Sequence, residues 1–282
     1  MTQHGNSLRK IVTQGEIIPL IGVYDVFSAS IAARHFNGLF VSGFSFAASH
    51  YGLPDIGFIA WSDIVAFSQR LRILLPQHHI VVDIDDGYCD MAVAVHAATV
   101  LERAGISGVI LEDQKRPRRC GHMEGKELLD IESFLEKLQQ VLENRHDLFV
   151  IARTDASEPE EILKRTQAYA KAGADAILAD GIKDLNILPK IKERTGMPLV
   201  FNQMAGGKSP PCSLVELQDL GVSIVNYSTP CLFAAQNAVE VAMQTLKEND
   251  GRLSALKQSS DLNDCSELLQ ENISLRDGIH HE

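Results

Sequence analysis

The chain has 282 residues, of which 45% are hydrophobic, so it can bury one large core. Its formal net charge of −11 at pH 7 disfavours nucleic acid as a partner, and it has no apolar run of about eighteen residues that would predict a membrane span. The five cysteines are scattered without paired spacing, and the N-terminus does not resemble a secretory signal. Both features indicate a reducing cytoplasm rather than a disulfide framework or a zinc site.

The predicted elements alternate between helix and strand. A short amphipathic helix over 8–17 comes first, and apolar strands follow at 17–23, 38–41, 79–86, 108–113, 148–153, 176–180, 198–202 and 223–227. Helices are predicted at 28–35, 61–75, 90–104, 130–144, 159–172, 184–194, 213–220 and 232–247. This alternation indicates parallel βαβ units, and eight of them favour a closed (β/α)8 TIM-type barrel over an open sheet.

The chain divides into two parts of different composition. Residues 1–247 are expected to form the barrel domain, whereas residues 248–282 are polar and carry only a narrow apolar helical stripe. A helix of this kind is marginal alone. We expect a C-terminal helical tail that either packs on a neighbouring subunit or frays, and the sequence does not choose between these two.

Polar side chains follow most of the strands. They are Tyr24, Asp25, Ser42, Gly43, Asp55, Asp83, Asp85, Asp86, Glu112, Arg153, Asp180 and Asn202. Barrel enzymes build their active sites at the carboxyl ends of the strands. Asp83 and Asp85 are two residues apart and are expected to share one face, where Glu112 from the next strand completes an all-oxygen cluster typical of Mg²⁺ or Mn²⁺. The alternative is that each acid caps its own following helix.

Two later segments are suited to a small anion. Arg153 can bind a carboxylate or phosphate through two parallel hydrogen bonds, and Asn202 is expected to face the same space. The segment 202–210 adds two glycines and the hydroxyl of Ser209. The alternative for this segment is an ordinary Gly/Pro turn.

The segment 108–128 concentrates reactive side chains after one strand. Glu112 and Asp113 end the strand, four cations follow at 115, 116, 118 and 119, and then comes Cys120-Gly121-His122. An electropositive loop is expected to lower the pKa of the Cys120 thiol. A solvated charged loop is the alternative, but an acid pair, a cation run and Cys-Gly-His at one strand end favour an active site.

Motifs spread along the chain resemble those of the isocitrate lyase/phosphoenolpyruvate mutase superfamily over roughly 20–245. They are Gly22-Val23-Tyr24-Asp25, Ser42-Gly43, Leu53-Pro54-Asp55, Asp83 with Asp85, Glu112-Asp113-Gln114, Cys120-Gly121-His122, Ala152-Arg153-Thr154-Asp155, and Asn202 with Gly206-Gly207 and Ser209-Pro210. The resemblance implies a barrel whose last helix is exchanged between subunits, a homotetramer built as a dimer of dimers, and one Mg²⁺ per site. The segment Arg118-Arg119-Cys120-Gly121-His122 looks like the mobile loop of the C–C bond lyases.

The resemblance also implies roles for individual residues. Asp83, Asp85 and Glu112 would hold Mg²⁺, with Mn²⁺ as a possible substitute. Cys120 would protonate the carbanion that forms when a 2-hydroxy- or 2-oxo-dicarboxylate is cleaved, with Arg153, Tyr24 and His122 as further catalytic residues. The residues implied to bind substrate are Ser42, Gly43, Asp55, Arg118, Gly121, Asp180, Asn202 and Ser209.

Three positions depart from the lyase pattern. Arg118 stands where the lyases have lysine, Asp180 where many relatives have glutamate, and Asp86 is expected to add a carboxylate beside the metal pair. A phosphonate enzyme that makes or breaks a C–P bond is the second hypothesis, because the arginines at 116, 118 and 119 suit a phosphorus-bearing substrate. A catalytically silent barrel is the third, and a Mg²⁺ titration without binding would support it.

Overall fold

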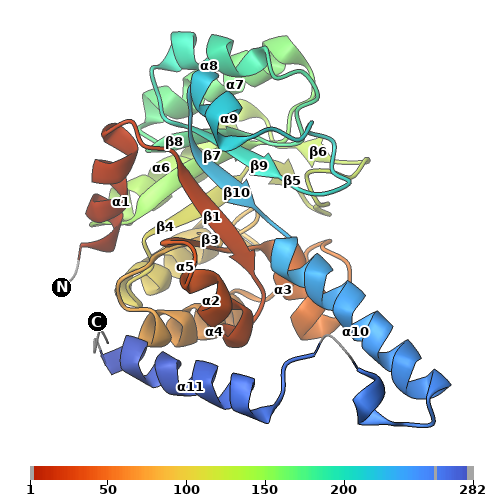
Figure 1. Ribbon diagram of the computed structural model, residues 1–282. Coiled ribbons are helices and arrows are strands. Elements are labelled where there is room, and N and C mark those ends of the chain that lie inside the picture. Colours follow the sequence, from red (N-terminus) through yellow and green to blue (C-terminus); the bar gives the residue numbers. More distant parts are fainter. Residues whose placement is uncertain (1–2, 257–258, 278–282) are drawn as a thin grey trace.

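The computed structural model describes residues 3–256 and 259–277, and its centre is a closed barrel of eight parallel strands (Figure 1). Each strand pairs in parallel with its two neighbours, and the first pairs with the last. The barrel strands are β1 (Ile18–Val23), β2 (Gly38–Val41), β3 (His79–Asp83), β4 (Gly108–Glu112), β7 (Phe149–Thr154), β8 (Ala176–Ala179), β9 (Leu199–Gln203) and β10 (Val222–Tyr227).

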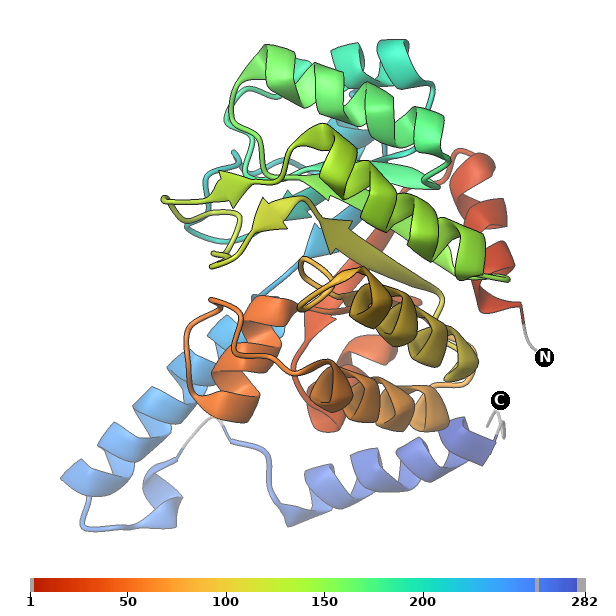
Figure 2. The same ribbon diagram turned by 180° about the vertical axis from the view of Figure 1, so that it is seen from behind.

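Helices alternate with these strands and surround them, so the predicted (β/α)8 barrel is confirmed (Figures 1 and 2). The helices are α1 (His4–Thr13), α2 (Val26–Ala33), α4 (Trp61–Leu74), α5 (Met91–Arg103), α6 (Ile131–Asn144), α7 (Pro159–Ala172), α8 (Ile187–Thr195), α9 (Leu214–Asp219), α10 (Pro230–Glu248) and α11 (Leu262–Asp277). A short 3-10 helix, η2 (Leu253–Ala255), lies between α10 and α11.

Two pieces of structure were not predicted. The chain after β2 forms α3 (Gly43–Phe46) and a π-helical turn, η1 (Ala47–Tyr51), where a loop was expected. The strands β5 (Gln114–Lys115) and β6 (Glu127–Leu128) form a separate antiparallel pair that brackets residues 116–126. This intervening segment is called the Cys120 loop below.

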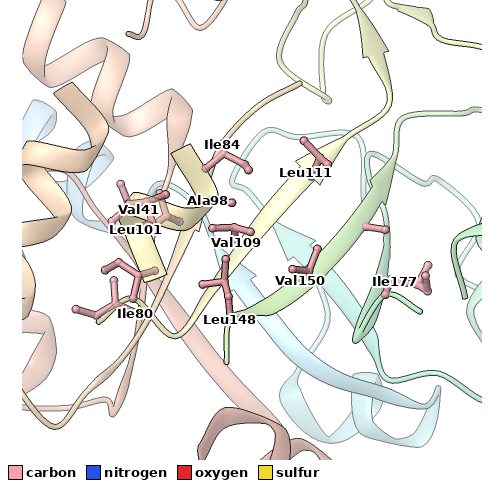
Figure 3. Close-up of a cluster of buried hydrophobic side chains, with 14 of the residues drawn as sticks. Val41, Ile80, Ile84, Ala98, Leu101, Val109, Leu111, Leu148, Val150 and Ile177 are labelled. Carbon is pink, nitrogen blue, oxygen red and sulfur yellow. The ribbon is translucent and has the colours of Figure 1, made fainter. Parts of the chain in front are cut away.

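Barrel side chains alternate between an inner and an outer layer, as the two-residue period of a strand requires. In β7, Phe149 and Ile151 pack inside the barrel, whereas Val150 and Ala152 pack outward against the helices. Figure 3 shows part of the outer layer, with Ile80, Val109, Leu111 and Val150 from three neighbouring strands near Ala98 and Leu101 of α5.

Helix α1 closes the amino-terminal end of the barrel. Leu8 and Val12 are buried and belong to the same apolar cluster as the inner-layer side chains. Arg9 fixes the helix by an ion pair with Asp175 and a hydrogen bond to the carbonyl of Leu148. With this end filled, the polar carboxyl-terminal end of the barrel is the one left for a site.

The last two long helices differ in how they pack. Helix α10 has no buried residue and projects away from the barrel in both views (Figures 1 and 2). Helix α11 instead lies against α4 of its own chain, with Leu268 buried, so this part of the polar tail packs on the barrel. Within residues 3–256 and 259–277, no helix combines the length and apolar character that a membrane span requires.

Candidate active site

Polar side chains occupy the inward position directly beyond the apolar inner layer. In β4, Ile110 belongs to the inner layer and Glu112 is the next inward residue, and Leu178 and Asp180 of the β8 segment repeat the arrangement. The residues at this level are Ser42, Asp83, Glu112, Arg153, Asp180, Asn202 and Asn226. Most of them line a cavity of about 20 Å³, which has room for roughly one water molecule.

The expected metal carboxylates converge, although for a different reason from the one predicted. The strand β3 ends at Asp83, and Asp85 lies in a left-handed turn with φ 53°, so strand pleating does not place it. The backbone N–H of Asp85 donates to the Asp83 carboxylate at 3.0 Å. Gly43 leaves room for both, because a Cβ there would lie 3.1 Å from Asp85 Oδ1 and 3.5 Å from Asp83 Oδ2.

Arg118 lies inside this group of carboxylates. Its side chain is 1% exposed, and its Nε donates to Glu112 Oε1 at 2.7 Å. Its other nitrogens pair with Asp55 and, at 3.4 Å, with Asp85 Oδ1. The guanidinium thus contacts two of the three residues predicted to hold a metal ion.

A second buried network surrounds Arg153. Its guanidinium donates two hydrogen bonds of 3.0 Å to Asp155 and forms a 2.8 Å ion pair with Asp180. Lys126 contacts Asp155 from the other side at 3.1 Å. Although burial opposes ionisation, these two cations lower the pKa of Asp155 to about 2. Asp180 and Asp155 therefore both pair with Arg153, and Asp180 is not an isolated acid at the end of its strand.

The Cys120 loop covers the cavity. Gly121 packs so closely on the buried network that a Cβ there would lie 2.1 Å from Asp180 Oδ2 and 2.4 Å from Arg153 Nη2. The imidazole of His122 accepts a 2.9 Å hydrogen bond from the backbone N–H of Lys208 and lies 3.3 Å from the amide of Asn202. The loop thus brings a thiol and an imidazole to the rim of the barrel.

The environment of Cys120 contradicts one expectation. Burial, together with the charge of Asp55, raises the pKa of the Cys120 thiol to about 12, whereas an electropositive loop was expected to lower it. The reason is that the nearby cations are taken up by carboxylates: Arg118 by the acid cluster and Arg116 by Asp86. At neutral pH the group is a thiol, which can donate a proton.

Some predicted site residues lie elsewhere. Tyr24 lines an apolar groove beside α2 and α10, and Ser209 is not among the residues that line the cavity. Asp86 was expected beside the metal pair but accepts two 2.8 Å hydrogen bonds from Arg116, so it anchors the Cys120 loop instead. The cavity also has members that were not predicted, namely Phe40, Phe44, Ile110, Leu178, Met204, Asn226 and Ser228.

The chemistry of the cluster fits a hard divalent cation. Six buried carboxylates (Asp55, Asp83, Asp85, Glu112, Asp155 and Asp180) face three cations (Arg118, Lys126 and Arg153). Burial raises the pKa of Asp83 and Asp85, and that of Glu112 to about 8, so these groups favour a further cation. Asp85 Oδ1 and Glu112 Oε2 are buried without a hydrogen bond among the described residues.

The positions of these carboxylate oxygens suit a bound metal ion less well than their chemistry does. Within residues 3–256 and 259–277, no group of three acids, histidines or cysteines is spaced to hold a metal ion. Mg²⁺ requires oxygen ligands at about 2.0–2.1 Å in near-octahedral geometry. Arg118 takes up space and lone pairs that such a set would need. The chemistry of the carboxylate donors therefore suits Mg²⁺, whereas the guanidinium of Arg118 occupies the place that the ion would need.

A closed parallel barrel with acids, a guanidinium and a thiol at its carboxyl-terminal end defines an enzyme of the (β/α)8 class. Comparison with known families then places the chain more narrowly. The model of the family described as phosphoenolpyruvate phosphomutase matches residues 8–247. The chain belongs to this family, the phosphoenolpyruvate mutase/isocitrate lyase family, as its motifs indicated.

Individual relatives include lyases and a phosphonate enzyme. The chain is 32% identical to a 2-methylisocitrate lyase of Bacillus subtilis (strain 168), over 88% of this chain and 83% of that one. The structure of a 2,3-dimethylmalate lyase matches with a TM-score of 0.91 at 28% identity, covering 98% of this chain and 95% of the other. That of phosphonopyruvate hydrolase in complex with oxalate and Mg²⁺ matches with a TM-score of 0.84 at 25% identity, covering 97% and 96%.

Proposed function

We propose that this enzyme is a Mg²⁺-dependent lyase that cleaves a C–C bond of a small 2-hydroxy- or 2-oxo-dicarboxylate. The class includes alkylmalates, methylisocitrate and oxaloacetate. The observation that carries the proposal is the cavity that Cys120, His122 and Arg153 line together with the carboxylates Asp55, Asp83 and Asp180. Similarity to 2-methylisocitrate lyase and 2,3-dimethylmalate lyase supports this substrate class.

The proposed roles follow from the chemistry of each group. Asp83, Asp85 and Glu112 would hold Mg²⁺, which supplies positive charge for the substrate's oxygen atoms. Arg153 binds a substrate carboxylate. In a 2-hydroxy substrate the C2 hydroxyl proton passes to a neighbouring carboxylate, C2 becomes a carbonyl carbon, and the electron pair of the broken C2–C3 bond stays on C3; a 2-oxo substrate first adds water at C2, which supplies the same hydroxyl. Cys120, protonated at neutral pH, delivers a proton to the resulting carbanion. The Cys120 loop excludes water while this intermediate exists.

The remaining predicted substrate residues would surround the bound molecule. Ser42, Asn202 and Asp180 line the cavity and offer a hydroxyl, an amide and a carboxylate, and Gly43 lies beside Asp83 and Asp85. Asp55, Arg118 and Gly121 lie at the junction with the Cys120 loop. Ser209 and Tyr24 keep a proposed role only if ligand binding brings them closer to the cavity.

The alternative is a C–P bond enzyme acting on a phosphonate, which similarity to phosphonopyruvate hydrolase supports. The extra arginines that favoured it are engaged within the chain. Arg116 pairs with Asp86, Arg118 with the acid cluster, and Arg119 donates to the carbonyl of Arg118 at 2.9 Å. The C–C lyase is therefore the first proposal.

The proposal extends to assembly and location. We propose a homotetramer, built as a dimer of dimers, in which α10 is exchanged between subunits and residues 248–282 contribute to packing. Support comes from α10, whose side chains have no buried position on their own barrel. All five cysteines are free thiols, which supports a cytoplasmic location.

Turnover of a small panel with Mg²⁺ tests the function. The panel contains oxaloacetate, 2-methylisocitrate, 2,3-dimethylmalate, further 2-alkylmalates and phosphonopyruvate, with Cys120→Ser alongside and the exposed-site variant Cys89→Ser as control. We expect one dicarboxylate to be cleaved, and Cys120→Ser to lower kcat by roughly 10²- to 10⁴-fold because it removes the proton donor. If no dicarboxylate is cleaved and phosphonopyruvate is converted, the enzyme instead acts on C–P bonds.

A further inference from the structure

Asp113 follows Glu112 directly and faces the other side of the barrel wall. Glu112 points into the barrel, so the two-residue period of a strand turns the next side chain outward, toward helix α7. There the Asp113 carboxylate accepts a hydrogen bond of 2.6 Å from the hydroxyl of Tyr169 and one of 3.0 Å from Nη1 of Arg165. All three side chains are buried, and none of them lines the cavity. The cluster therefore lies behind the candidate active site.

A buried ion pair is a costly way to attach a helix to a barrel. Apolar side chains of similar size often give equal or greater stability, because burying two charges removes them from water at a cost. Apolar packing is already present here, since the ring of Tyr169 lies against Phe134 of α6 with the ring centroids 4.6 Å apart. The charges of Asp113 and Arg165 therefore point to a role besides the attachment of α7.

The Asp113 carboxylate is linked to the cavity through Asp155. Its Oδ1 accepts a hydrogen bond of 3.1 Å from the backbone N–H of Asp155, whose carboxylate accepts two of 3.0 Å from Nε and Nη2 of Arg153. One edge of the guanidinium is thereby fixed. The remaining nitrogen, Nη1, makes no hydrogen bond within the described part of the chain and lies 3.9 Å from Asp83 Oδ2. Because Arg153 lines the cavity, Nη1 is the donor left for a substrate oxygen.

We propose that Asp113, Tyr169 and Arg165 are positioning residues for the substrate carboxylate. Tyr169 and Arg165 hold the Asp113 carboxylate. Asp113 in turn holds the backbone of Asp155, and the Asp155 carboxylate orients Arg153 so that Nη1 is left for the substrate. This support sets the affinity for a dicarboxylate and takes no part in bond cleavage. The inference rests on the proposed function, in which Arg153 binds a substrate carboxylate.

Steady-state kinetics of Tyr169→Phe, on the dicarboxylate that the wild type cleaves, measures this role. The variant loses one hydroxyl and keeps the ring that packs on Phe134. We expect KM to rise about tenfold with kcat within about twofold of the wild type, because an interaction common to the bound substrate and the transition state affects KM alone. Calorimetric titration with oxalate in the presence of Mg²⁺, which needs no turnover, should show the same loss of affinity. Arg165→Met removes the second donor to Asp113 and should act in the same direction.

Two further variants are matched controls. Tyr51→Phe removes a phenol hydroxyl that also bonds a carboxylate, that of Asp63, in a part of the barrel that does not line the cavity. Glu161→Gln changes the other partner of Arg165 and leaves the hydrogen bond to Asp113 in place. Both controls should keep the KM and the oxalate affinity of the wild type.

A double-mutant cycle tests the route through Asp155. In an Asp155→Ala background the link between Asp113 and Arg153 is already cut, so Tyr169→Phe should change the oxalate affinity by less than about twofold. A further loss of about tenfold in that background would show that Tyr169 acts by another route, and the proposed support would be wrong.

The outcomes separate this inference from the proposed function. If the wild type cleaves a dicarboxylate while Tyr169→Phe and Arg165→Met keep its KM and its oxalate affinity, the positioning role is wrong and the proposed function stands. A lower kcat at unchanged KM has the same meaning, because it reports only a smaller folded fraction. If the wild type neither cleaves a dicarboxylate nor binds oxalate, the proposed function fails and the positioning role fails with it.

Discussion

Asn226 is a buried polar residue that lacks a hydrogen-bond partner among the described residues. It is 1% exposed, lines the cavity from β10, and neither amide atom has a hydrogen bond among the described residues. Asn202 occupies the equivalent position of β9, and its amide contacts Asp180, His122 and Ser228. A buried amide without partners costs stability, so Asn226 is suited to bind a polar group of the substrate.

We expect Asn226→Leu to stabilise the protein by about 1–3 kcal/mol and to weaken substrate binding, because the change replaces two unsatisfied polar atoms by methyl groups in the same branched arrangement. Urea unfolding measures the first effect and KM the second. Asn202→Leu is the matched control and should destabilise, since it leaves three polar neighbours without their partner. A less stable Asn226→Leu protein would contradict this account.

Residues at strand ends were predictable, and residues positioned by loops were not. The two-residue period of a strand places Asp83, Glu112 and Arg153 inside the barrel from the sequence alone. Asn226 obeys the same rule and could have been found by extending it to the last strand. The carboxylate partners of Arg118 could not be predicted, because they are fixed by the tertiary path of the Cys120 loop. Tyr24 follows the end of β1 at Val23 and lines the apolar groove rather than the cavity.

At the level of elements, long helices and buried strands were predicted within a few residues, and short irregular pieces were missed. The helix at 159–172 was predicted at both of its ends, helped by a proline at its first position and a left-handed glycine after its last. The segment 43–51 was predicted to be a loop because it contains many small residues. Ser42 was not recognised from the sequence as the N-cap of a helix that begins at Gly43. The β5–β6 pair is too short to show a periodic pattern.

The carboxylate of Glu102 connects helix α5 to the turn before strand β7. Glu102, in the last turn of α5, accepts hydrogen bonds from the backbone N–H groups of His146, Asp147 and Leu148, the turn that leads into β7. Burial alone would raise the pKa of Glu102, but these hydrogen bonds outweigh it and lower the pKa below 4.5. The carboxylate therefore ties helix to strand in its ionised form.

We expect Glu102→Ala to lower the free energy of unfolding by about 1–3 kcal/mol at pH 7, because it leaves three backbone donors, two of them partly buried, without their acceptor, and Glu102→Gln to cost less. Since the folded-state pKa is depressed, the benefit of ionised Glu102 is present above pH 4.5 and is lost as the pH falls through the lowered value. Urea unfolding at several pH values tests this, with the exposed Glu136→Gln as control. A difference between wild type and Glu102→Gln that persists at low pH would exclude an ionic role.

At the scale of the whole molecule, helix α10 and a groove beside it both expose apolar side chains. The groove lies between α2, α9 and the start of α10, has a volume of about 740 Å³, and exposes Phe27 and Ile31. Farther along α10, Val239, Val241 and Met243 are more than half exposed. Large apolar surfaces of this kind mark interfaces. Phe233 of α10 also packs edge-on against Phe44, which lines the cavity.

Exchange of α10 between two copies therefore predicts that substitutions on either surface have the same effect. Ile31→Glu in the groove and Val241→Glu on α10 should each dissociate the assembly, because each places a charge in a buried apolar contact, whereas Ile73→Glu, on the exposed face of α4, should not. Light scattering after gel filtration gives the mass, and the wild type should run near four times the 31.0 kDa of one chain. If α10 stood free in solution, the wild type would run as a single chain and neither substitution would change its mass.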